Sequence, residues 1–303
     1  MPIDALCIGH AAYDVSMFVD EFPAENSKRE TQVLLQSGGG PAANAACLLS
    51  SWGNRCAFAG LVGDDDYGRR IREEFETAGT DVSLLELQPG HETPLSFILV
   101  NRKNGSRTIV NRKAQKRALD VSLAKLEALS PGMLVFDGHE LPASLAALQA
   151  FPNAISMLDA GSWREGTAKL AGLVDYLVTS EPFALRAGGV ANLDCEEARR
   201  VCVRELRNRF DAITIVTLGE NGLIADDGCG FRHFPAYPAK AVDTTAAGDI
   251  FHGALVFAIA GKMAFNESLR FAAMAASLSV RVAGGRASIP PLDQVREALN
   301  RAG

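Results

Sequence analysis

Short apolar segments alternate with amphipathic ones along most of the chain. Six of the apolar segments are typical of strands: 5–9, 56–62, 133–136, 154–158, 176–178 and 212–217. Helical patterns lie between most of them. Nearly continuous apolar strands that alternate with helices predict a mostly parallel sheet with helices on both faces. We therefore expect one doubly wound α/β domain over residues 1–303.

Two regions interrupt this alternation, residues 12–37 and 93–112. In the second region, the apolar runs 96–100 and 108–110 flank Asn104 and Gly105, a pair that is typical of a tight hairpin turn. Neither region is long enough to fold alone. We therefore expect both to contribute strands to one small antiparallel sheet that projects from the domain as a lid.

Composition narrows the range of functions. The chain of 303 residues is 48% hydrophobic, which is enough for a large core, and its formal charge of -6 comes without a long run of like charges. Nucleic acid is therefore not an expected partner. Six cysteines without a Cys-x-x-Cys pair predict neither disulfides nor a structural zinc, and no apolar run approaches the length of a membrane span. With no secretion signal at its N-terminus, the protein is expected in the cytoplasm.

A run of small residues precedes a predicted helix at 252–260. The small side chains of Ala246, Ala247 and Gly248 would let backbone N–H groups converge on an anion, and the helix N-terminus adds about half a positive charge. The turn therefore predicts a phosphoryl site. In such a turn, the carboxylate of Asp249 could accept the proton of an attacking hydroxyl group, although it could also only complement the helix dipole.

A second glycine-rich turn lies near the N-terminus. Gly39 and Gly40 end a run of three glycines, Pro41 is suited to the first turn of the helical pattern at 45–52, and Asn44 follows. Such a run exposes backbone donors, but by itself it is more typical of a plain turn between a strand and a helix. Its distance from the Asp249 turn, about 200 residues, makes the pair of motifs informative.

In order and spacing, the two motifs resemble the two signatures of the PfkB family of ribokinase-like carbohydrate kinases. Residues 243–249 match the form Asp-Thr-x-Gly-Ala-Gly-Asp at six of seven positions, and Ala246 stands where the family usually has glycine. If this position has a positive φ, the alanine costs about 1 kcal/mol. The resemblance covers nearly the whole chain. It implies an enzyme that transfers the γ-phosphate of ATP to a sugar hydroxyl, with Asp249 as the catalytic base beside the turn at 246–248.

The resemblance also implies which residues bind the two substrates. On the sugar side it indicates Asp14, Lys28, Gly39, Gly40, Asn44, Asn111 and His139. On the nucleotide side it indicates Arg107, Thr217, Gly219, Gly222, Thr244 and Gly285. Each also has a plainer reading, because Asp14 is typical of a turn and Lys28 and Arg107 of a solvated surface. His139 stands where sulfofructose kinases of the family have an arginine, which weakens the case for a sulfonated sugar.

Magnesium is expected as a cofactor because the phosphates of ATP must be neutralised. Many relatives organise it through an Asn-x-x-Glu pair, but residues 180–183 here are Ser-Glu-Pro-Phe, so no metal ligand is assigned to the protein. K⁺ is a further candidate, held near Asp243, Thr245 and the turn at 284–288. In relatives the lid sheet often pairs across two subunits, which favours a homodimer, although the lid could equally close over its own site.

The resemblance is strongest to the ketohexokinase and sulfofructose kinase branches, notably at residues 104–110, so a ketose or a ketose derivative is the expected substrate. A ribokinase or nucleoside kinase of the same family is an alternative. A regulator that binds nucleotide without turnover is another, because Ala246 and the absent Glu depart from the family pattern. A dinucleotide-dependent oxidoreductase is disfavoured, because no Gly-x-Gly-x-x-Gly follows the first strand.

Overall fold

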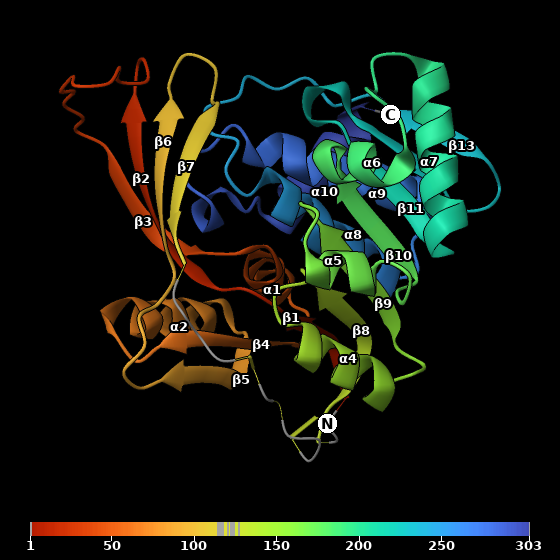
Figure 1. The fold of residues 1–303 in the computed structure, drawn as a ribbon, viewed down its shortest axis with the longest axis horizontal. Helices are drawn as coiled ribbons and strands as arrows, with labels where there is room; N and C mark the ends of the chain where they lie inside the picture. The colour runs from red at the N-terminus through yellow and green to blue at the C-terminus, as the bar shows by residue number, and fades with distance from the viewer. Residues whose placement is uncertain (1, 114–117, 120, 122–124, 127, 303) are drawn as a thin grey trace.

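The structure, a computed structural model, describes residues 2–113, 118, 119, 121, 125, 126 and 128–302 (Figure 1). Its main sheet has the strand order β13-β12-β11-β10-β9-β8-β1-β4-β5. The strands are β1 (Pro2–Ile8), β4 (Cys56–Gly63), β5 (Asp81–Gln88), β8 (Ser130–Phe136), β9 (Ile155–Ala160), β10 (Tyr176–Ser180), β11 (Ile213–Thr217), β12 (Leu223–Asp226) and β13 (Phe231–Phe234). Neighbours from β5 to β11 are parallel, and β12 and β13 extend the sheet as antiparallel strands.

Helices cover both faces of this sheet, as the alternating pattern predicts. They are α1 (Pro41–Ser51), α2 (Asp66–Ala78), α4 (Leu141–Ala150), α5 (Glu165–Leu170), α6 (Glu181–Gly188), α7 (Glu196–Phe210), α8 (Ala247–Ala260), α9 (Phe265–Ser279) and α10 (Leu292–Ala302). Successive strand residues enter two separate apolar cores, with Cys7 in one and Leu6 in the other. Helices α1, α2, α8, α9 and α10 pack into the first core, and α4 to α7 pack into the second.

The predicted doubly wound fold is confirmed, and all six predicted strands are present with their ends shifted by a few residues. Sequence periodicity missed β5 and the pair β12 and β13. These three strands lie at the two edges of the sheet, where one side of a strand meets less of the core. β5 accordingly mixes polar with apolar residues, which hides it from a search for apolar runs.

A second sheet stands apart from the first, at the left of Figure 1. It has the order β3-β2-β6-β7 and consists of β2 (Ala12–Val19), β3 (Leu34–Gly39), β6 (Leu95–Asn101) and β7 (Arg107–Arg112). The outer pairs are antiparallel, and the central pair of β2 and β6 is parallel. On one face Phe18, Ile98 and Val100 form a small core, whereas Phe97 and Val110 are exposed. The predicted small sheet is therefore present, and pairing of two copies through it stays a prediction.

Close packing of α1 against α8 brings the two sequence motifs together. Gly253 of α8 lies so near α1 that an added Cβ atom would be 3.2 Å from Cα of Ala45. Because glycine and alanine hold these positions, the two helix backbones approach closely. The first turns of both helices thereby meet at the carboxyl ends of the central strands.

Among the described residues, no helix is long and apolar enough to cross a membrane.

Candidate active site

A cleft of about 800 Å³ lies between the carboxyl ends of the parallel strands and the second sheet. This edge is where parallel α/β sheets bind ligands, because the loops that follow the strands meet there. The polar side chains that line it come from strand ends, from the first turns of α1 and α8, and from β2, β6 and β7. They include His10, Asp14, Asn44, Arg107, Asn111, His139, Asp159, Arg164, Ser180, Thr217, Thr245, Asp249 and His252.

Asp243 fixes the turn that precedes α8. Its buried carboxylate accepts hydrogen bonds from the backbone N–H groups of Thr245 and Gly284, each at 2.9 Å. Within this turn Ala246 has a φ of 62°, and α8 begins at the next residue. The positive φ that would penalise an alanine is therefore present, at a cost of about 1 kcal/mol relative to glycine.

Asp249 lies in the first turn of α8 and faces the cleft. Its Oδ2 accepts a hydrogen bond of 2.6 Å from Nδ2 of Asn44, a buried residue of α1. Removal from water raises the pKa of Asp249 above its usual value, and the hydrogen bond from Asn44 opposes this rise. The two residues that the sequence assigns to catalysis and to sugar binding are thus in direct contact.

Asp14 faces the same cleft from β2. Burial, opposed by a hydrogen bond with Ser96, raises its pKa to about 6. A Cβ atom added to Gly39 would be 2.1 Å from Oδ2 of Asp14, and one added to Gly40 would be 2.2 Å from the carbonyl oxygen of His10. The glycine run therefore has a steric cause: it makes room for Asp14 and for the loop after β1. Gly40 lines the cleft, and Gly39 lies behind Asp14.

Asp137, just after β8, supports the residues around the cleft, and the sequence did not single it out. Its buried carboxylate accepts hydrogen bonds from the backbone N–H groups of His10 (2.8 Å), Ala42 (3.3 Å) and His139 (3.0 Å). It thereby ties together the ends of β1 and β8 and the start of α1. The rings of His10 and His139 stack with their centroids 4.5 Å apart. A lone Asp after a strand looks like a turn residue, so only the fold reveals these contacts.

A buried pair of Asp159 and His252 lies behind Asp249. Nδ1 of His252 is 3.3 Å from Oδ2 of Asp159 and 2.6 Å from the carbonyl oxygen of Gly248. Since both neighbours are acceptors, Nδ1 carries a proton and donates it. Burial raises the pKa of Asp159 to about 6, with the charge of His252 acting against this rise. Neither residue belongs to a motif that could be recognised in the sequence.

Arg107 connects the second sheet to the turn before α8. Its Nη1 donates hydrogen bonds to the carbonyl oxygen (2.9 Å) and to Oγ1 (2.7 Å) of Thr244. The backbone N–H and the hydroxyl of Thr244 in turn donate to the carbonyl oxygen of Gly105. The hairpin between β6 and β7 is therefore anchored beside the predicted phosphoryl site. Arg107 lines the cleft there, whereas Thr244 supports it from behind.

Arg164 is a second cationic side chain in the cleft. Unlike Arg107, it was not singled out from the sequence. It follows β9, and its Nη1 lies against Nε2 of His139 while its other nitrogen atoms contact Oγ of Ser162. Within the described parts of the chain, no carboxylate lies within 4 Å of its guanidinium group. Arg164 therefore places a guanidinium beside His139, the position where the sequence indicated the loss of an arginine.

Some predicted site residues lie outside the lining of the cleft. Thr217 lines it at the end of β11, but Gly219 and Gly222 lie in the following turn with positive φ values of 57° and 86°. Lys28 is exposed in the loop between β2 and β3. The remaining lining residue on the sugar side, Asn111, is on β7. Ala247 and Gly285 adjoin the Ala246 turn without lining the cleft. The roles of these residues stay predictions.

Comparisons with known proteins agree with this geometry. A family model described as "pfkB family carbohydrate kinase" matches residues 3–292. The ribokinase of Lactococcus lactis is 29% identical over 268 residues, which are 86% of this chain and 85% of the relative. Mouse ketohexokinase is 26% identical over 284 residues, with 88% and 92% covered, and a nucleoside kinase of Methanothermobacter thermautotrophicus is 26% identical over 307 residues, with 95% and 92% covered.

Solved structures show the same architecture. Thermotoga maritima ribokinase has a TM-score of 0.81 and 25% identity, with 99% of each chain covered. Arabidopsis thaliana ribokinase, solved with ribose and ATP, has a TM-score of 0.82 and 23% identity, again with 99% of each chain covered. Because the family model spans nearly the entire chain, the protein belongs to the PfkB family of ribokinase-like carbohydrate kinases and is an ATP-dependent sugar or nucleoside kinase.

Proposed function

We propose that this kinase transfers the γ-phosphate of ATP to a hydroxyl group of a ketose or a ketose derivative. The observation that carries the proposal is the position of Asp249, whose Oδ2 is held by Asn44 at the point where the cleft meets the turn before α8. The other oxygen, Oδ1, would then face a substrate hydroxyl. A base so placed can remove the hydroxyl proton as the new bond to phosphorus forms.

The sugar would lie between Asp249 and Asp14. The ionised carboxylate of Asp14 accepts hydrogen bonds from hydroxyl groups and so orients the ring. His139 and Asn111 face the same cleft from the end of β8 and from β7. The guanidinium group of Arg164 beside His139 favours a substrate with an anionic substituent, such as a sulfonated ketose, over a neutral hexose.

ATP would place its phosphates beside the turn before α8. A Cβ atom added to Gly248 would meet no atom within 4 Å, so space is open above this turn, and the N-terminus of the 14-residue α8 attracts anions. Arg107 and Thr217 are the side chains that would contact the nucleotide. The transferred group would thus lie next to Asp249, with its charge stabilised by backbone N–H groups and by Arg107.

Two cations fit this site in different ways. Among the described residues, no three metal-ligating side chains gather, so Mg²⁺ would be held mainly by the phosphates and water and would neutralise their charge. For K⁺, particular oxygen atoms of the protein are candidate ligands. Oγ1 of Thr245 is buried without a hydrogen-bond partner in the described structure, and the backbone N–H of the same residue donates to the carboxylate of Asp243. Both are oxygen ligands of the kind that K⁺ would require.

Ribose is the second candidate substrate. The Lactococcus relative, named as a ribokinase, is 29% identical to this chain, compared with 26% for the ketohexokinase of mouse. The same cleft of about 800 Å³ can hold either sugar. A nucleoside would need additional space for its base. Because a relative from Methanothermobacter is named as a nucleoside kinase, the experiment also includes nucleosides.

The experiment is ADP formation with Mg²⁺ and K⁺ across fructose, tagatose, sulfofructose, ribose, adenosine and inosine. The proposal predicts the largest kcat/KM for one of the three ketoses. A preference for ribose or for a nucleoside would reject the ketose and retain the kinase. If ATP binds but no compound is turned over, phosphoryl transfer to these sugars is rejected. Omitting K⁺ tests the cation site in the same assay.

A further inference from the structure

A chain of hydrogen bonds leads from the catalytic carboxylate to a second groove in the protein. Oδ1 of Asn44 accepts a hydrogen bond of 3.2 Å from Nε of Arg286, while its Nδ2 donates to Asp249. Nη1 of Arg286 donates to Glu74 at 2.8 Å, and Glu74 accepts the backbone N–H of Gly38 at 2.8 and 3.0 Å. Four separate segments, including the end of the lid strand β3, are therefore connected to Asp249.

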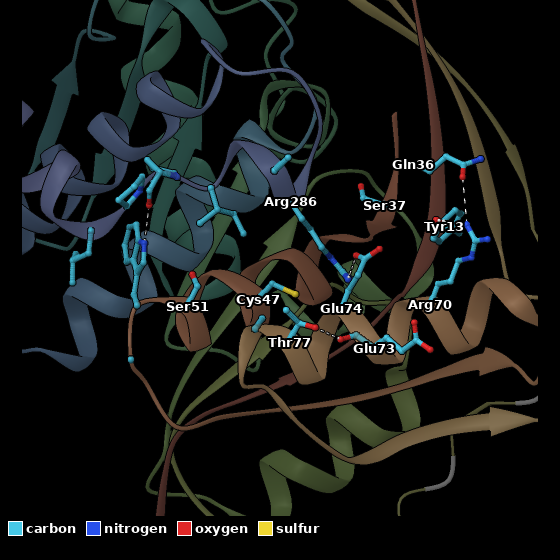
Figure 2. Close-up of a pocket in the computed structure, with 18 of the residues that line it drawn as sticks. Tyr13, Gln36, Ser37, Cys47, Ser51, Arg70, Glu73, Glu74, Thr77 and Arg286 are labelled. Atoms are coloured by element: carbon cyan, nitrogen blue, oxygen red, sulfur yellow. Dashed lines mark hydrogen bonds and ion pairs between the residues drawn. The ribbon is translucent and has the colours of Figure 1, made fainter. Parts of the chain in front are cut away.

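Figure 2 shows this chain where it reaches the groove, which has a volume of about 1100 Å³. Arg286 extends from the short helix at Arg286–Ser288 to Glu74 of α2. The side chain of Arg286 is only 9% exposed, whereas that of Glu74 is 31% exposed. The guanidinium carbon of Arg286 also lies 4.6 Å from the ring centre of Phe75. An ion pair, an aromatic ring and the amide of Asn44 thus hold the arginine in one place.

Arg286 and Asp249 together determine which way the amide of Asn44 points. Arginine has donors only, so it can contact the oxygen of the amide and not its nitrogen. With Oδ1 engaged, Nδ2 is the atom directed at Asp249. The ionised carboxylate of Asp249 also selects Nδ2, because it has acceptors only, so both partners favour the same orientation of the amide. Without Arg286, only one of these two contacts would hold the amide, and the hydrogen bond that favours the ionised form of Asp249 would be held less firmly.

We infer that Arg286 is a positioning residue for phosphoryl transfer: it fixes the amide of Asn44 so that Asn44 donates to Asp249 and keeps this carboxylate ready to accept a proton. The inference rests on the proposed role of Asp249 as the base. Glu74 in turn holds Arg286, and through Gly38 it connects this set of residues to β3. The position of the base therefore depends on a side chain that does not contact the substrate.

Other charges also act on Asp249, and any test must separate them from Arg286. The groups that influence it or are influenced by it are Asp14 on β2, Arg107 on β7, Asp137 after β8, Asp159 on β9 and His252 on α8. None of these residues is itself replaced in variants of Arg286 and Glu74. Arg286 lowers and Glu74 raises the pKa of Asp14, which interacts with Asp249, so R286M and E74Q also change the charge near the site. R286K keeps the positive charge, so a change in the titration of Asp249 in R286K reports on the amide of Asn44.

The test compares R286K and R286M with the wild type by following the carboxyl carbon signals of the aspartates in NMR against pH. The signal of Asp249 is assigned by its absence in D249N. Lysine can keep the ion pair with Glu74 but has no donor at the position of Nε. We expect Asp249 to titrate at higher pH in both variants than in the wild type. This measurement requires no turnover, so it stands even if the proposed function fails.

Kinetics give the second measurement, with the best substrate of the sugar panel. We expect kcat to fall about tenfold in R286K and R286M, which is the effect expected for the loss of one charge-assisted hydrogen bond. The acid limb of the pH profile of kcat should move to higher pH. The Kd for ATP should stay unchanged. R70M is the matched control, because Arg70 lines the same groove and its nearest partners, Tyr13 and Gln36, lie at 3.4 and 3.5 Å.

The titration of Asp249, compared with kcat, separates positioning from a purely structural role. If R286K has the titration of Asp249 and the kcat of the wild type, the inference is wrong, whatever its urea midpoint. It is also wrong if kcat falls while the titration of Asp249 does not move. If R286M does not fold, E74Q replaces it, since Glu74 is partly exposed and its loss of charge loosens Arg286. A small shift of Asp249 to higher pH is then expected, and no shift would contradict the inference.

Discussion

Two of the carboxylates that line the cleft, Asp249 and Asp14, come from different regions of the molecule, and their surroundings differ. Asp249 lies in the first turn of α8 in the main body, and its Oδ2 is held by Asn44, which is itself held by Arg286. Asp14 lies on β2 of the small sheet, where burial raises its pKa to about 6. Burial raises the pKa of both carboxylates. They differ in their donors, because Asp249 accepts from an amide that Arg286 holds, whereas Asp14 accepts from the hydroxyl of Ser96.

This difference suggests that the two carboxylates have different roles, Asp249 in catalysis and Asp14 in sugar binding. A general base must hold one oxygen at a fixed position relative to the attacking hydroxyl, because a displacement of about 1 Å can cost on the order of 100-fold in rate. A group that binds sugar hydroxyls needs charge and access, and it can move with the sheet that carries it. We therefore expect changes at Asp249 to reduce kcat, and changes at Asp14 to raise the KM for sugar.

The largest effect is expected for D249N. Asparagine keeps the size of the side chain and removes the base, so kcat should fall on the order of 10²- to 10⁴-fold. ATP binding should be retained, because the carboxylate is not proposed to contact the nucleotide. Single-turnover phosphorylation and the Kd for ATP measure the two quantities separately. Turnover close to that of the wild type would rule out Asp249 as the base.

D14N should act mainly on sugar binding. The loss of charge-assisted hydrogen bonds to the sugar should raise KM about 10- to 100-fold, with a smaller change in kcat. D20N is the matched control, because Asp20 is exposed just beyond β2. If D14N lowers kcat and leaves KM unchanged, the proposed division between the two carboxylates is incorrect.

The raised pKa of Asp14 also predicts an effect on stability. Folding raises this pKa from 3.8 to about 6, so the folded state binds more protons than the unfolded state between these values. The ionised carboxylate therefore destabilises the protein above pH 6, by about 1–3 kcal/mol, and this cost decreases as pH falls through the window. D14N should be more stable than the wild type at pH 7.5, by urea unfolding, and the gain should shrink at pH 5. A gain that is constant or grows toward pH 5 would contradict this.

Those parts of the site whose residues lie next to one another in the chain could be predicted from the sequence. The turn around Ala246 and the glycines before α1 are recognisable by their small residues, and the apolar strands predict the parallel sheet. The small sheet was predicted from two regions that interrupt the strand–helix alternation and from the apolar runs on either side of Asn104 and Gly105. The parallel pairing of β2 with β6 carries no local signal, because it joins strands that are far apart in the sequence.

The supporting residues could not be found in this way. Asp137 and His252 each resemble ordinary polar residues at the end of a strand or on a helix. Arg286 meets Asn44 across 242 positions of sequence, and Glu74 across 212. Their contacts exist only because α1, α2 and the turn after α9 converge in the fold. A single sequence records the identity of such residues but not which other residues they meet.

The smallest effect is expected for A246G, which tests the strain in the turn beside Asp249. Ala246 has a φ of 62°, which glycine adopts without penalty, so the substitution should stabilise the folded protein by up to about 1 kcal/mol. Glycine also gains freedom in the unfolded chain, which offsets part of this. The urea midpoint measures the net change, and A247G, at a helical position without positive φ, should lower it. Turnover of A246G should be unchanged or raised. A large loss would show that the methyl group of Ala246, which lies 3.6 Å from a Cβ built on Gly285, is needed to hold the turn.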